Sequence, residues 1–384
     1  MKIILSVQPI RFPMTGIGRY TLELARHLAD IDDIEELKFF GDEHFVDGLP
    51  TPGNSQSRPA SVITRIKHRL ARNPVLLDIY RKRVHKRRGR ALSGKDDYLY
   101  HGPNFYLPPF PGRSVVTIHD LSVFTMPEHH PAERVMFIRK EVEFALKQAT
   151  MLITDAEYTR HEVAEYFGWP IKKVRSAALA GGAEFYPREP EVTAPVLARY
   201  DLTPGGYGLY TGTIEPRKNL VRLLDAYGRM PLALRKRFPL VLAGYKGWNN
   251  EETVARINKA EKEGWARYLG FVPNDDLPIL FAGARLFAFP SLYEGFGLPI
   301  LEAMASGIPV VTSTSSTLPE AAGDAAATCA PDDVEALTGL LERGLDDEAW
   351  RRQAIEKGFA QAAKFSWQRC AEETAAIYRS ALAQ

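Results

Sequence analysis

The stretch LFAFPSLYEGFGLPILEAMASGIPVVTS, residues 286–313, carries the most information about the fold of this chain. Two short apolar runs, residues 286–290 and 309–313, bracket a helical pattern at residues 299–306. Pro299 fits the first position of that helix, where a backbone N–H is not needed. Continuous apolar strands joined by a helix are typical of a parallel sheet that helices cover on both faces.

The same alternation continues on both sides of this stretch. Further strands are predicted at residues 3–7, 37–40, 98–101, 115–119, 151–154, 208–212, 240–243 and 266–270, and further helices at 18–28, 132–149, 157–167, 220–230, 251–263 and 275–282. Pro and Gly residues between positions 187 and 206 predict a linker. We therefore expect an α/β fold with two Rossmann-like, doubly wound parallel-sheet domains, residues 1–186 and 207–365, that face a ligand cleft.

Length and composition agree with this expectation. The 384 residues are too many for one ordinary core, and 45% apolar with 25% charged residues is an average globular composition. That composition excludes disordered and low-complexity proteins. Two cysteines, Cys329 and Cys370, cannot form a disulfide framework, so a reducing cytoplasm is expected. No apolar run approaches the ~20 residues of a transmembrane helix.

The charge of the chain is unevenly distributed. The net charge is +2, yet residues 63–90 hold eleven Lys or Arg and one acid, Asp78. Apolar residues alternate with these cations, which is typical of a segment that docks on an anionic membrane surface. A solvated pair of basic helices is the alternative interpretation. The lack of a nucleic-acid motif argues against a nucleic-acid partner.

Residues 291–302 place two carboxylates beside a predicted anion site. Gly295 and Gly297 form a loop that leads into the helix, whose first amides would bind a phosphate. Glu294 lies in the loop and Glu302 in the first helical turn, so each can accept hydrogen bonds from sugar hydroxyls. For either Glu alone, an ordinary surface charge is the alternative.

Two further motifs predict anion binding. Arg217 and Lys218 precede the helix at residues 220–230. Cations are disfavoured at the positive end of a helix dipole, so a diphosphate that they neutralise explains them better than a solvated pair. Gly16 and Gly18 lead from the first strand into a helix, either as an anion-binding turn or simply as a tight turn. Thr21 replaces the third glycine of a nicotinamide fingerprint, which argues against an oxidoreductase.

In these motifs the chain resembles the retaining family-4 glycosyltransferases of GT-B architecture. The matched pieces follow the family's order over nearly the whole chain, at residues 16–18, 119–120, 212–219, 270–272, 294–302 and 319–324. The string TIEPRKN at residues 213–219 resembles the branch that builds bacterial polysaccharides, often from GDP-mannose or related GDP-sugars. The resemblance also implies that the C-terminal helices return toward the N-terminal domain, with residues 366–384 packing back on it.

The resemblance implies residue roles as well. Glu294 would contact the donor sugar with His119 nearby, and Lys218 would bind the diphosphate. Many members carry Arg where this chain has Thr213, so we expect Arg217 to supply that charge. The remaining candidates are Glu302 at the ribose, Gly297 and Leu298 at the distal phosphate, Phe271 and Val272 at the base through their backbone, Phe296, Gly212 and Thr213 in the donor loops, Gly16 and Gly18 beside the phosphates and acceptor, Lys246 at a phosphate, and Asp120 as local support or an acceptor contact.

The predicted reaction moves a hexose, preferably mannose or D-rhamnose from a GDP-sugar, onto a lipid-linked or polysaccharide acceptor in O-antigen-like biosynthesis. The resemblance implies retention of configuration and no protein nucleophile.

The expected partners are a nucleoside-diphosphate sugar, a glycan or polyprenyl-diphosphate-linked acceptor and an anionic membrane, and the expected location is the cytoplasmic face of that membrane. We expect no cofactor and no metal, because no His/Cys cluster has ligand spacing and Asp30 and Asp32 read as solvated charges. A UDP- or ADP-sugar donor, a GT-B nucleotide-sugar epimerase and a non-catalytic sugar-nucleotide-binding module are the alternatives.

Overall fold

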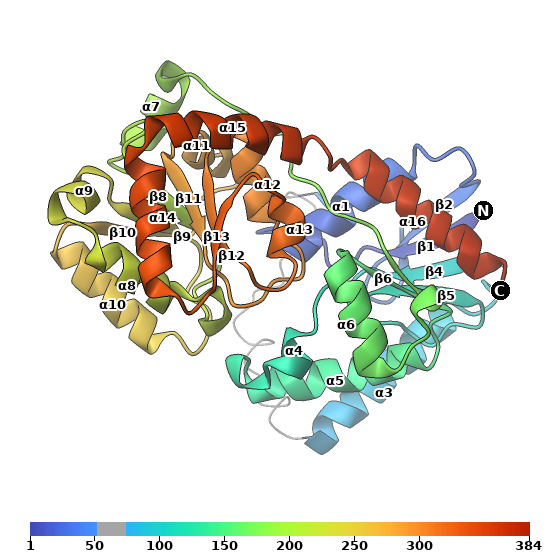
Figure 1. Cartoon of the computed structure of the whole chain (residues 1–384). Helices are drawn as coiled ribbons and strands as arrows, with labels where there is room; N and C mark the ends of the chain where they lie inside the picture. Colours follow the sequence, from blue (N-terminus) through green and yellow to red (C-terminus); the bar gives the residue numbers. More distant parts are fainter. Residues whose placement is uncertain (52–73) are drawn as a thin grey trace. The chain divides into compact units, whose positions relative to one another are not determined.

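The computed structural model describes residues 1–51 and 74–384 of the chain. The chain divides into two compact units. The first unit comprises Met1–Ala178 and Trp367–Gln384, and the second comprises Leu179–Ser366. Each unit is built on one largely parallel sheet with helices packed on it (Figure 1). The predicted α/β architecture with two doubly wound units is therefore confirmed.

The sheet of the first unit has the strand order β3-β2-β1-β4-β5-β6-β7. All neighbours pair in parallel except β3, which runs antiparallel to β2. The strand order reverses between β1 and β4, which is where ligands bind in sheets of this kind. The strands are β1 Lys2–Ser6, β2 Glu36–Phe40, β3 Phe45–Val46, β4 Leu99–Gly102, β5 Arg113–Thr117, β6 Met151–Thr154 and β7 Val174–Ser176.

The helices of the first unit include the last helix of the chain. They are α1 Gly16–Leu28, α3 Pro74–Ala91, α4 Ser122–Thr125, η1 Pro127–His129, α5 Ala132–Leu146, α6 Glu157–Phe167, η2 Ile171–Lys173 and α16 Trp367–Leu382. Helix α16 packs against α1, β5 and β6. A buried polar chain adds to this packing, because Tyr378 Oη lies 2.7 Å from His101 Nδ1, and Thr117 Oγ1 lies 2.8 Å from His101 Nε2. Burial lowers the pKa of His101 to about 3, so this imidazole is neutral.

The second unit has six parallel strands in the order β10-β9-β8-β11-β12-β13. The strands are β8 Gly208–Thr211, β9 Leu240–Ala243, β10 Ala266–Gly270, β11 Leu286–Phe289, β12 Val310–Ser313 and β13 Ala327–Cys329. The helices are α7 Pro190–Ala198, η3 Pro216–Lys218, α8 Leu220–Arg229, α9 Leu232–Arg237, α10 Glu251–Lys262, α11 Leu277–Ala282, α12 Leu298–Ala305, α13 Leu318–Ala322, α14 Val334–Asp346 and α15 Glu348–Ala362.

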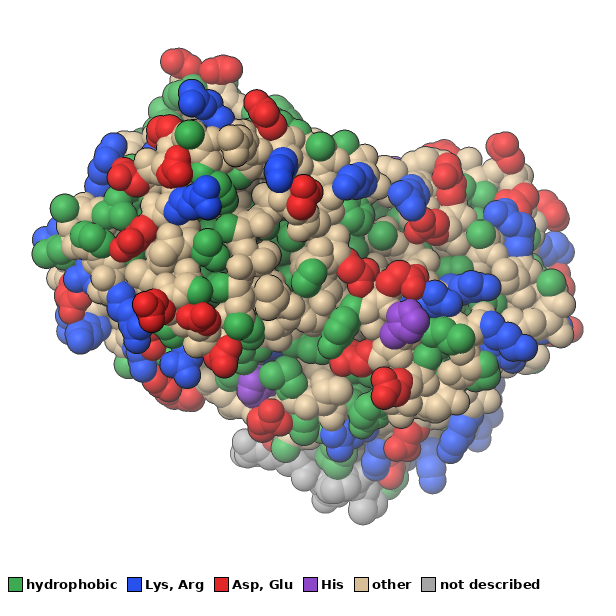
Figure 2. Space-filling view, in the orientation of Figure 1, with side chains coloured by type: hydrophobic (Ala, Val, Ile, Leu, Met, Phe, Trp, Pro, Cys, Tyr) green, Lys and Arg blue, Asp and Glu red, His purple; other side chains and the backbone are tan. Residues whose placement is uncertain are grey.

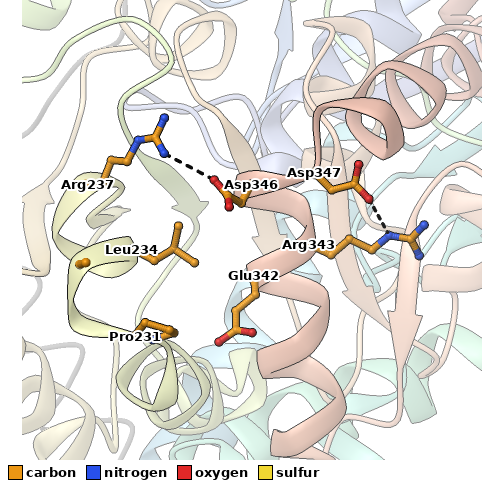
Figure 3. A pocket seen from close by; sticks show the side chains of 8 residues that line it. Pro231, Leu234, Arg237, Glu342, Arg343, Asp346 and Asp347 are labelled. Carbon is orange, nitrogen blue, oxygen red and sulfur yellow. Dashed lines mark hydrogen bonds and ion pairs between the residues drawn. The ribbon is translucent and has the colours of Figure 1, made fainter.

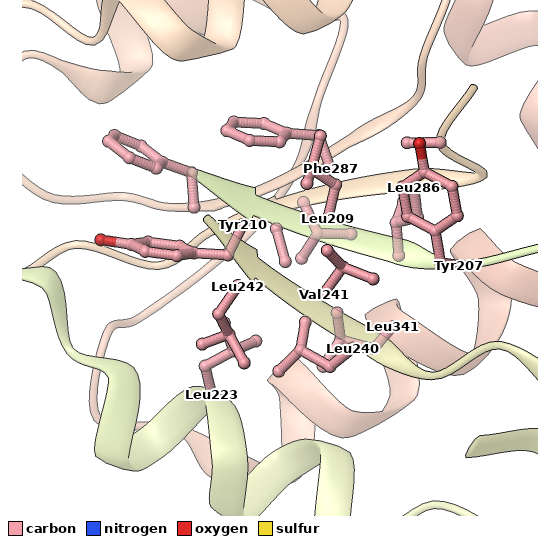
Figure 4. Close-up of a cluster of buried hydrophobic side chains, with 14 of the residues drawn as sticks. Tyr207, Leu209, Tyr210, Leu223, Leu240, Val241, Leu242, Leu286, Phe287 and Leu341 are labelled. Carbon is pink, nitrogen blue, oxygen red and sulfur yellow. The ribbon is translucent and has the colours of Figure 1, made fainter. Parts of the chain in front are cut away.

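The core of the second unit lies against the central strands. Leu223 of α8 and Leu341 of α14 are fully buried beside the apolar residues of β8 and β9 (Figure 4). Each of the four residues of β8, β9 and β11 is buried, which explains why these strands read as continuous apolar runs in the sequence.

The structure differs from the sequence-based prediction at several elements. Strands β3, β7 and β13 were not predicted, because elements of two or three residues show no periodic pattern. The predicted linker at residues 187–206 contains helix α7, in which Pro190 stands at the start, where its missing N–H costs nothing. Helix α12 begins at Leu298, so Pro299 takes the second helical position. None of the helices in the described part of the chain has the length and apolar composition needed to span a bilayer.

Candidate functional site

The second unit gathers several of the predicted site residues at one edge of its sheet. Arg217 and Lys218 lie on η3, shortly after β8, and Glu294 lies in the loop after β11. Strands β8 and β11 are parallel neighbours, so their carboxyl ends meet at the same edge. Side chains that are 76 residues apart in the sequence therefore touch.

Glu294 is the centre of this edge. Its Oε1 accepts hydrogen bonds from Lys218 Nζ at 2.6 Å and from Ser291 Oγ at 2.7 Å. Its Oε2 accepts a bond from Arg217 Nη1 at 3.0 Å. The residue is only 8% exposed. An ionised carboxylate has about four acceptor positions, so these three bonds leave one, on Oε2, for the hydroxyl of a ligand.

The charge of Glu294 is stabilised by its neighbours. Burial by itself raises the pKa of the Glu294 carboxyl, but the Lys218 and Arg217 charges outweigh burial and hold the pKa below its usual value. Removing one partner from such a buried group typically costs about 3–5 kcal/mol, because the other charges then lack compensation. The Glu294 carboxylate is thus ionised and held by three hydrogen bonds.

Arg217 is bound on several sides by the protein itself. Its Nη1 also donates to the carbonyl of Tyr293 at 2.6 Å, and its Nη2 donates to Glu215 Oε1 at 2.8 Å. These bonds tie the loop after β8 to the loop after β11. They favour a positioning role for Arg217 and leave Lys218 as the cation better placed for a diphosphate, a role that stays a prediction.

Three hydroxyl side chains that the sequence reasoning missed hold the Glu294 loop in place. Ser291 donates to the carboxylate, Ser316 Oγ accepts the backbone N–H of Glu294 at 2.9 Å, and Thr317 Oγ1 lies 3.0 Å from the carbonyl of Glu294. The run TSTSST at residues 312–317, which ends β12, was the available signal. A cluster of hydroxyls at a strand end next to a predicted anion site is a natural supplier of such bonds.

Helix α12 carries the second carboxylate. Glu302 is 6% exposed and is the fifth residue of the helix, so it lies in the second turn and not in the first as predicted. Gly297 precedes the helix with φ +110°, and Leu298 is its first residue. Pro299 has no N–H, and Ile300 N donates to the carbonyl of Gly297 at 2.9 Å, so the predicted phosphate donors at this end are the N–H groups of Gly297 and Leu298. The Phe296 ring is buried edge-to-face against Phe365 at 5.7 Å, which leaves its backbone for any contact with a donor.

The other predicted donor residues follow along the same carboxyl edge. Gly212 has φ +146° and Gly244 has φ +144°, and a Cβ on Gly244 would lie 1.9 Å from the carbonyl oxygen of Gly212. Only glycine allows the loops after β8 and β9 to approach this closely. Among the remaining predicted donor residues, Thr213 lies beside Gly247, and Lys246 is exposed with its Nζ 5.3 Å from the centre of the Tyr268 ring. Phe271 is exposed, whereas Val272 is buried.

A surface groove of the second unit lies elsewhere. It runs between α9 and α14, and Figure 3 shows the side chains that line it, most of them labelled. Helix α9 leads into the amino end of β9, so the groove is at the opposite end of the strands from Glu294. Its Arg237–Asp346 and Arg343–Asp347 ion pairs neutralise most of its charge. The groove therefore has no part in the site.

In the first unit, the predicted glycine turn opens α1. The side chain of Thr15 caps the helix by accepting the N–H of Gly18 at 3.3 Å. Gly16 is exposed, and a Cβ there would meet nothing within 4 Å. Gly18 is buried, and a Cβ there would lie 3.0 Å from the carbonyl oxygen of Pro9. Only Gly16 therefore leaves open space for a ligand, while Gly18 serves packing.

His119 is also buried in the first unit, where it pairs with a residue that the sequence reasoning missed. Its Nδ1 lies 2.7 Å from Asp155 Oδ2, and its Nε2 lies 2.8 Å from the carbonyl oxygen of Pro103. Both ring nitrogens face acceptors, so both must donate and the imidazole carries a proton on each. Burial lowers the pKa of His119, but Asp155 and the Pro103 carbonyl outweigh burial and raise it above 6.5. Asp155 comes directly after β6, at the strand end where a partner is expected.

The neighbour of His119 has a local role. Asp120 Oδ1 accepts hydrogen bonds from Ser122 N at 2.8 Å and Ser122 Oγ at 2.6 Å, at the start of α4. This geometry agrees with the expected local support. In the described residues, no three His, Cys, Asp or Glu side chains are grouped as metal ligands would be. Metal independence stays a prediction.

The basic segment is described only in part, because residues 63–73 lie outside the described residues. The remainder belongs to α3. Arg81 and His85 turn inward to the buried Glu141 of α5, with His85 Nε2 at 3.1 Å. The outward residues of α3 are Ile79, Tyr80, Lys82, Arg83, Lys86, Arg87 and Arg90, all exposed. Figure 2 shows Lys and Arg side chains gathered at the lower right, over the position of α3 in Figure 1.

Comparison with known proteins identifies the family. The description "Glycosyl transferases group 1" matches residues 206–361. An O-antigen chain mannosyltransferase B of Escherichia coli is 45% identical over 379 residues, which is 99% of this chain and 100% of that protein. The chain belongs to the group 1 glycosyltransferases. Serotype-specific mannosyltransferase WbdA of Escherichia coli is 35% identical over 266 residues, which cover 67% of this glycosyltransferase and 32% of WbdA.

Solved structures of low sequence identity share the fold. A sucrose-phosphate synthase from Thermosynechococcus elongatus superposes with a TM-score of 0.72 at 19% identity, with 100% of this chain and 99% of that chain covered. WaaG, a glycosyltransferase involved in lipopolysaccharide biosynthesis, gives a TM-score of 0.66 at 15% identity, with 98% and 99% covered. These neighbours confirm the predicted GT-B architecture, and the predicted family membership is confirmed by the close relative.

The two glycines of α1 predict opposite outcomes for one substitution. Gly16→Ala adds a methyl group in open space, so we expect the free energy of unfolding to stay within about 0.5 kcal/mol while kcat/KM for sugar transfer falls about tenfold. Gly18→Ala pushes its Cβ against Pro9, so we expect a loss of roughly 1–3 kcal/mol in the free energy of unfolding. Urea unfolding and steady-state kinetics measure both. Full activity of Gly16→Ala would show that no ligand approaches this turn.

The two buried histidines predict opposite protonation states. His119 is expected to keep its second proton to a higher pH than a free imidazole does, while His101 with its pKa of about 3 is neutral and serves as the internal reference. The folded-state pKa of His119 lies above its unfolded value, so its contribution to stability is complete below about pH 6.5. That contribution is lost as the pH rises through the folded-state pKa.

NMR of ¹³C-labelled imidazole rings would measure both states directly. The free energy of unfolding should also decline above about pH 6.5 in the wild type and decline less in His119→Asn. A neutral His119 ring at pH 6 would contradict the assignment.

Proposed function

We propose that this glycosyltransferase transfers mannose from GDP-mannose, with retention of configuration, to a growing O-antigen-like polysaccharide held on a lipid at the cytoplasmic face of the membrane. The observation that carries the proposal is the buried Glu294 carboxylate, bound by Lys218 and Arg217 beside the N-terminus of α12. The preference for mannose is supported by the 45% identity to a mannosyltransferase over nearly the whole chain.

The transfer exchanges one bond at the anomeric carbon for another. The bond from that carbon to the β-phosphate oxygen breaks, and GDP leaves with the electron pair. The acceptor hydroxyl oxygen bonds to the same face of the anomeric carbon, and its proton passes to a β-phosphate oxygen. The barrier lies in the negative charge on GDP and the positive charge on the sugar, so fixed charges around the site would supply most of the catalysis.

The residues of the second unit suit these two charges. Lys218 and the N–H groups of Gly297 and Leu298, at the start of α12, would stabilise the departing diphosphate. The remaining acceptor position of Glu294 would take a hydroxyl of the donor sugar and orient it. Glu302, buried on the same helix, would accept hydrogen bonds from the ribose hydroxyls. Arg217 would keep Glu294 ionised and in place.

The outward face of α3 would bring the enzyme to its acceptor. Lys82, Arg83, Lys86 and Arg90 lie three, four, seven and eleven residues after Ile79, so the five residues share one face of the helix. Arg81 and His85 make hydrogen bonds to Glu141 on the inward face of α3, so the opposite face, on which these five residues are exposed, lies toward solvent. Cations around an exposed isoleucine suit an anionic lipid surface, where each contributes about 1 kcal/mol.

The ribose role of Glu302 predicts a selective loss of donor affinity. The purified protein should convert GDP-mannose and an acceptor glycan into GDP and an α-linked product, as followed by NMR of the anomeric proton. Glu302→Gln should raise KM for GDP-mannose roughly 10- to 100-fold, because charge-assisted hydrogen bonds contribute about 1.5–3 kcal/mol.

The exposed Glu335 of α14 offers a matched control. Glu335→Gln should leave KM for GDP-mannose unchanged. Binding of mannose 1-phosphate, which has no ribose, should be unaffected by either change. A wild-type protein without transfer activity would contradict the proposed function, and an unchanged KM in Glu302→Gln would contradict the ribose role.

The basic face of α3 predicts binding to anionic membranes. Replacing Lys82, Arg83, Lys86 and Arg90 by Gln should weaken partition onto phosphatidylglycerol-containing vesicles by roughly 4 kcal/mol, about a thousandfold. The same replacement of four exposed cations of the second unit should have a much smaller effect; these are Lys236, Lys259, Lys262 and Arg352. Vesicle sedimentation measures both. Equal losses in the two variants would mean that the net charge and not this face drives binding.

A further inference from the structure

We propose that the exposed aromatic pair Tyr245–Phe271 is a stacking platform for the base of the donor nucleotide, and that it favours a purine over a pyrimidine. The inference rests on the proposed function and deepens it. The family resemblance places only the backbone at Phe271 beside the base, and a backbone contact does not distinguish one base from another. The side chains of this chain supply that discrimination.

The two rings form a stack that is open to solvent. Their centres lie 4.9 Å apart with an angle of 17° between the planes. Tyr245 is 49% exposed and Phe271 is 45% exposed. By contrast, the stacked pairs Tyr210–Phe289, Tyr227–Trp265 and Phe287–Phe289 consist of buried core rings. A parallel pair of large rings held at the surface offers flat apolar faces to another flat ring.

Three hydrogen bonds hold the backbone beneath the pair. Gly244 N donates to the carbonyl of Gly270 at 2.7 Å, which joins the two loops that carry the rings. Ile214 N donates to the carbonyl of Tyr245 at 2.8 Å, and Tyr268 Oη donates to the carbonyl of Gly244 at 2.8 Å. The rings are therefore exposed on rigid loops, and a ligand that stacks on them meets a surface already in place.

The pair also lies at a suitable distance from the predicted diphosphate site. Phe271 follows β10 and Tyr245 follows β9, while Lys218 follows β8 on the same carboxyl edge. Neighbouring strands are about 4.8 Å apart, so the platform is on the order of 10 Å from the Lys218 loop. The close approach of Gly244 to Gly212 keeps the loops after β9 and β8 in contact. This separation matches the reach of a nucleoside diphosphate from its base to its phosphates.

The preference for a purine follows from ring size. Two fused rings cover more of an aromatic surface than the single ring of a pyrimidine, and stacking strength grows with the covered area. Loss of one aromatic partner from a base stack typically weakens binding roughly 5- to 150-fold. We therefore expect GDP to bind this protein about tenfold more tightly than UDP.

Isothermal titration of the full-length protein with GDP, UDP and inorganic diphosphate tests the inference. Tyr245→Ala and Phe271→Ala should each weaken GDP binding roughly tenfold, weaken UDP binding less, and leave diphosphate binding unchanged. Tyr245→Phe keeps the ring and should bind GDP like the wild type. Tyr186→Ala removes a similarly exposed ring from the same unit and serves as the matched control.

The outcomes separate this inference from the proposed function. A wild-type protein that binds GDP while both alanine variants bind it equally well would overturn the platform and leave the proposed function standing. A wild-type protein that binds neither GDP nor GDP-mannose would overturn the proposed function itself. Equal losses for GDP and diphosphate would mean that the loops and not the stacking were disturbed. An unchanged ratio of GDP to UDP affinity in the variants would overturn the purine preference.

Discussion

One buried carboxylate between two cations organises the second unit. Glu294 has little contact with water, so its charge requires Lys218 and Arg217 to be present and correctly placed. Those two residues come from the loop after β8 and Glu294 from the loop after β11. The ion group therefore joins neighbouring strand ends and gives the carboxyl edge of the sheet a defined shape before a ligand binds.

Close contacts between backbones connect the Glu294 edge of the sheet to the Tyr245–Phe271 stacking platform. Gly212 and Gly244 bring the loops after β8 and β9 into contact, and Gly297 brings the Glu294 loop into α12. Charge lies at one end of this row of loops and exposed aromatic surface at the other. A molecule with a diphosphate at its centre and a flat base at one end is complementary to both. The donor proposed here has that chemistry.

The first unit shows how partners decide the state of a side chain. His101 and His119 are both buried in the same unit, yet one faces hydroxyls and the other faces a carboxylate and a carbonyl. Hydroxyls can donate or accept, so His101 stays neutral. Acceptors on both sides require two protons, so His119 is charged. The Asp155 that enforces this state ties His119 to the end of β6.

The sequence by itself determined the alternation of strands and helices, because a strand buried on both faces must be a continuous apolar run. It also determined that Glu294, Lys218 and His119 stand near strand ends, where sites form in such sheets. Tertiary structure alone decided the partners: Arg217 with Glu294, Ser316 beneath the Glu294 loop, and Asp155 beside His119. The spacing of apolar residues indicates which side chains of a segment are buried. It does not indicate which distant residue a side chain contacts, because a contact between residues 36 or 77 positions apart depends on the order of the strands in the sheet. The stacking of Tyr245 on Phe271 has the same origin, since these residues are far apart in the sequence and the pairing of β9 with β10 brings them together.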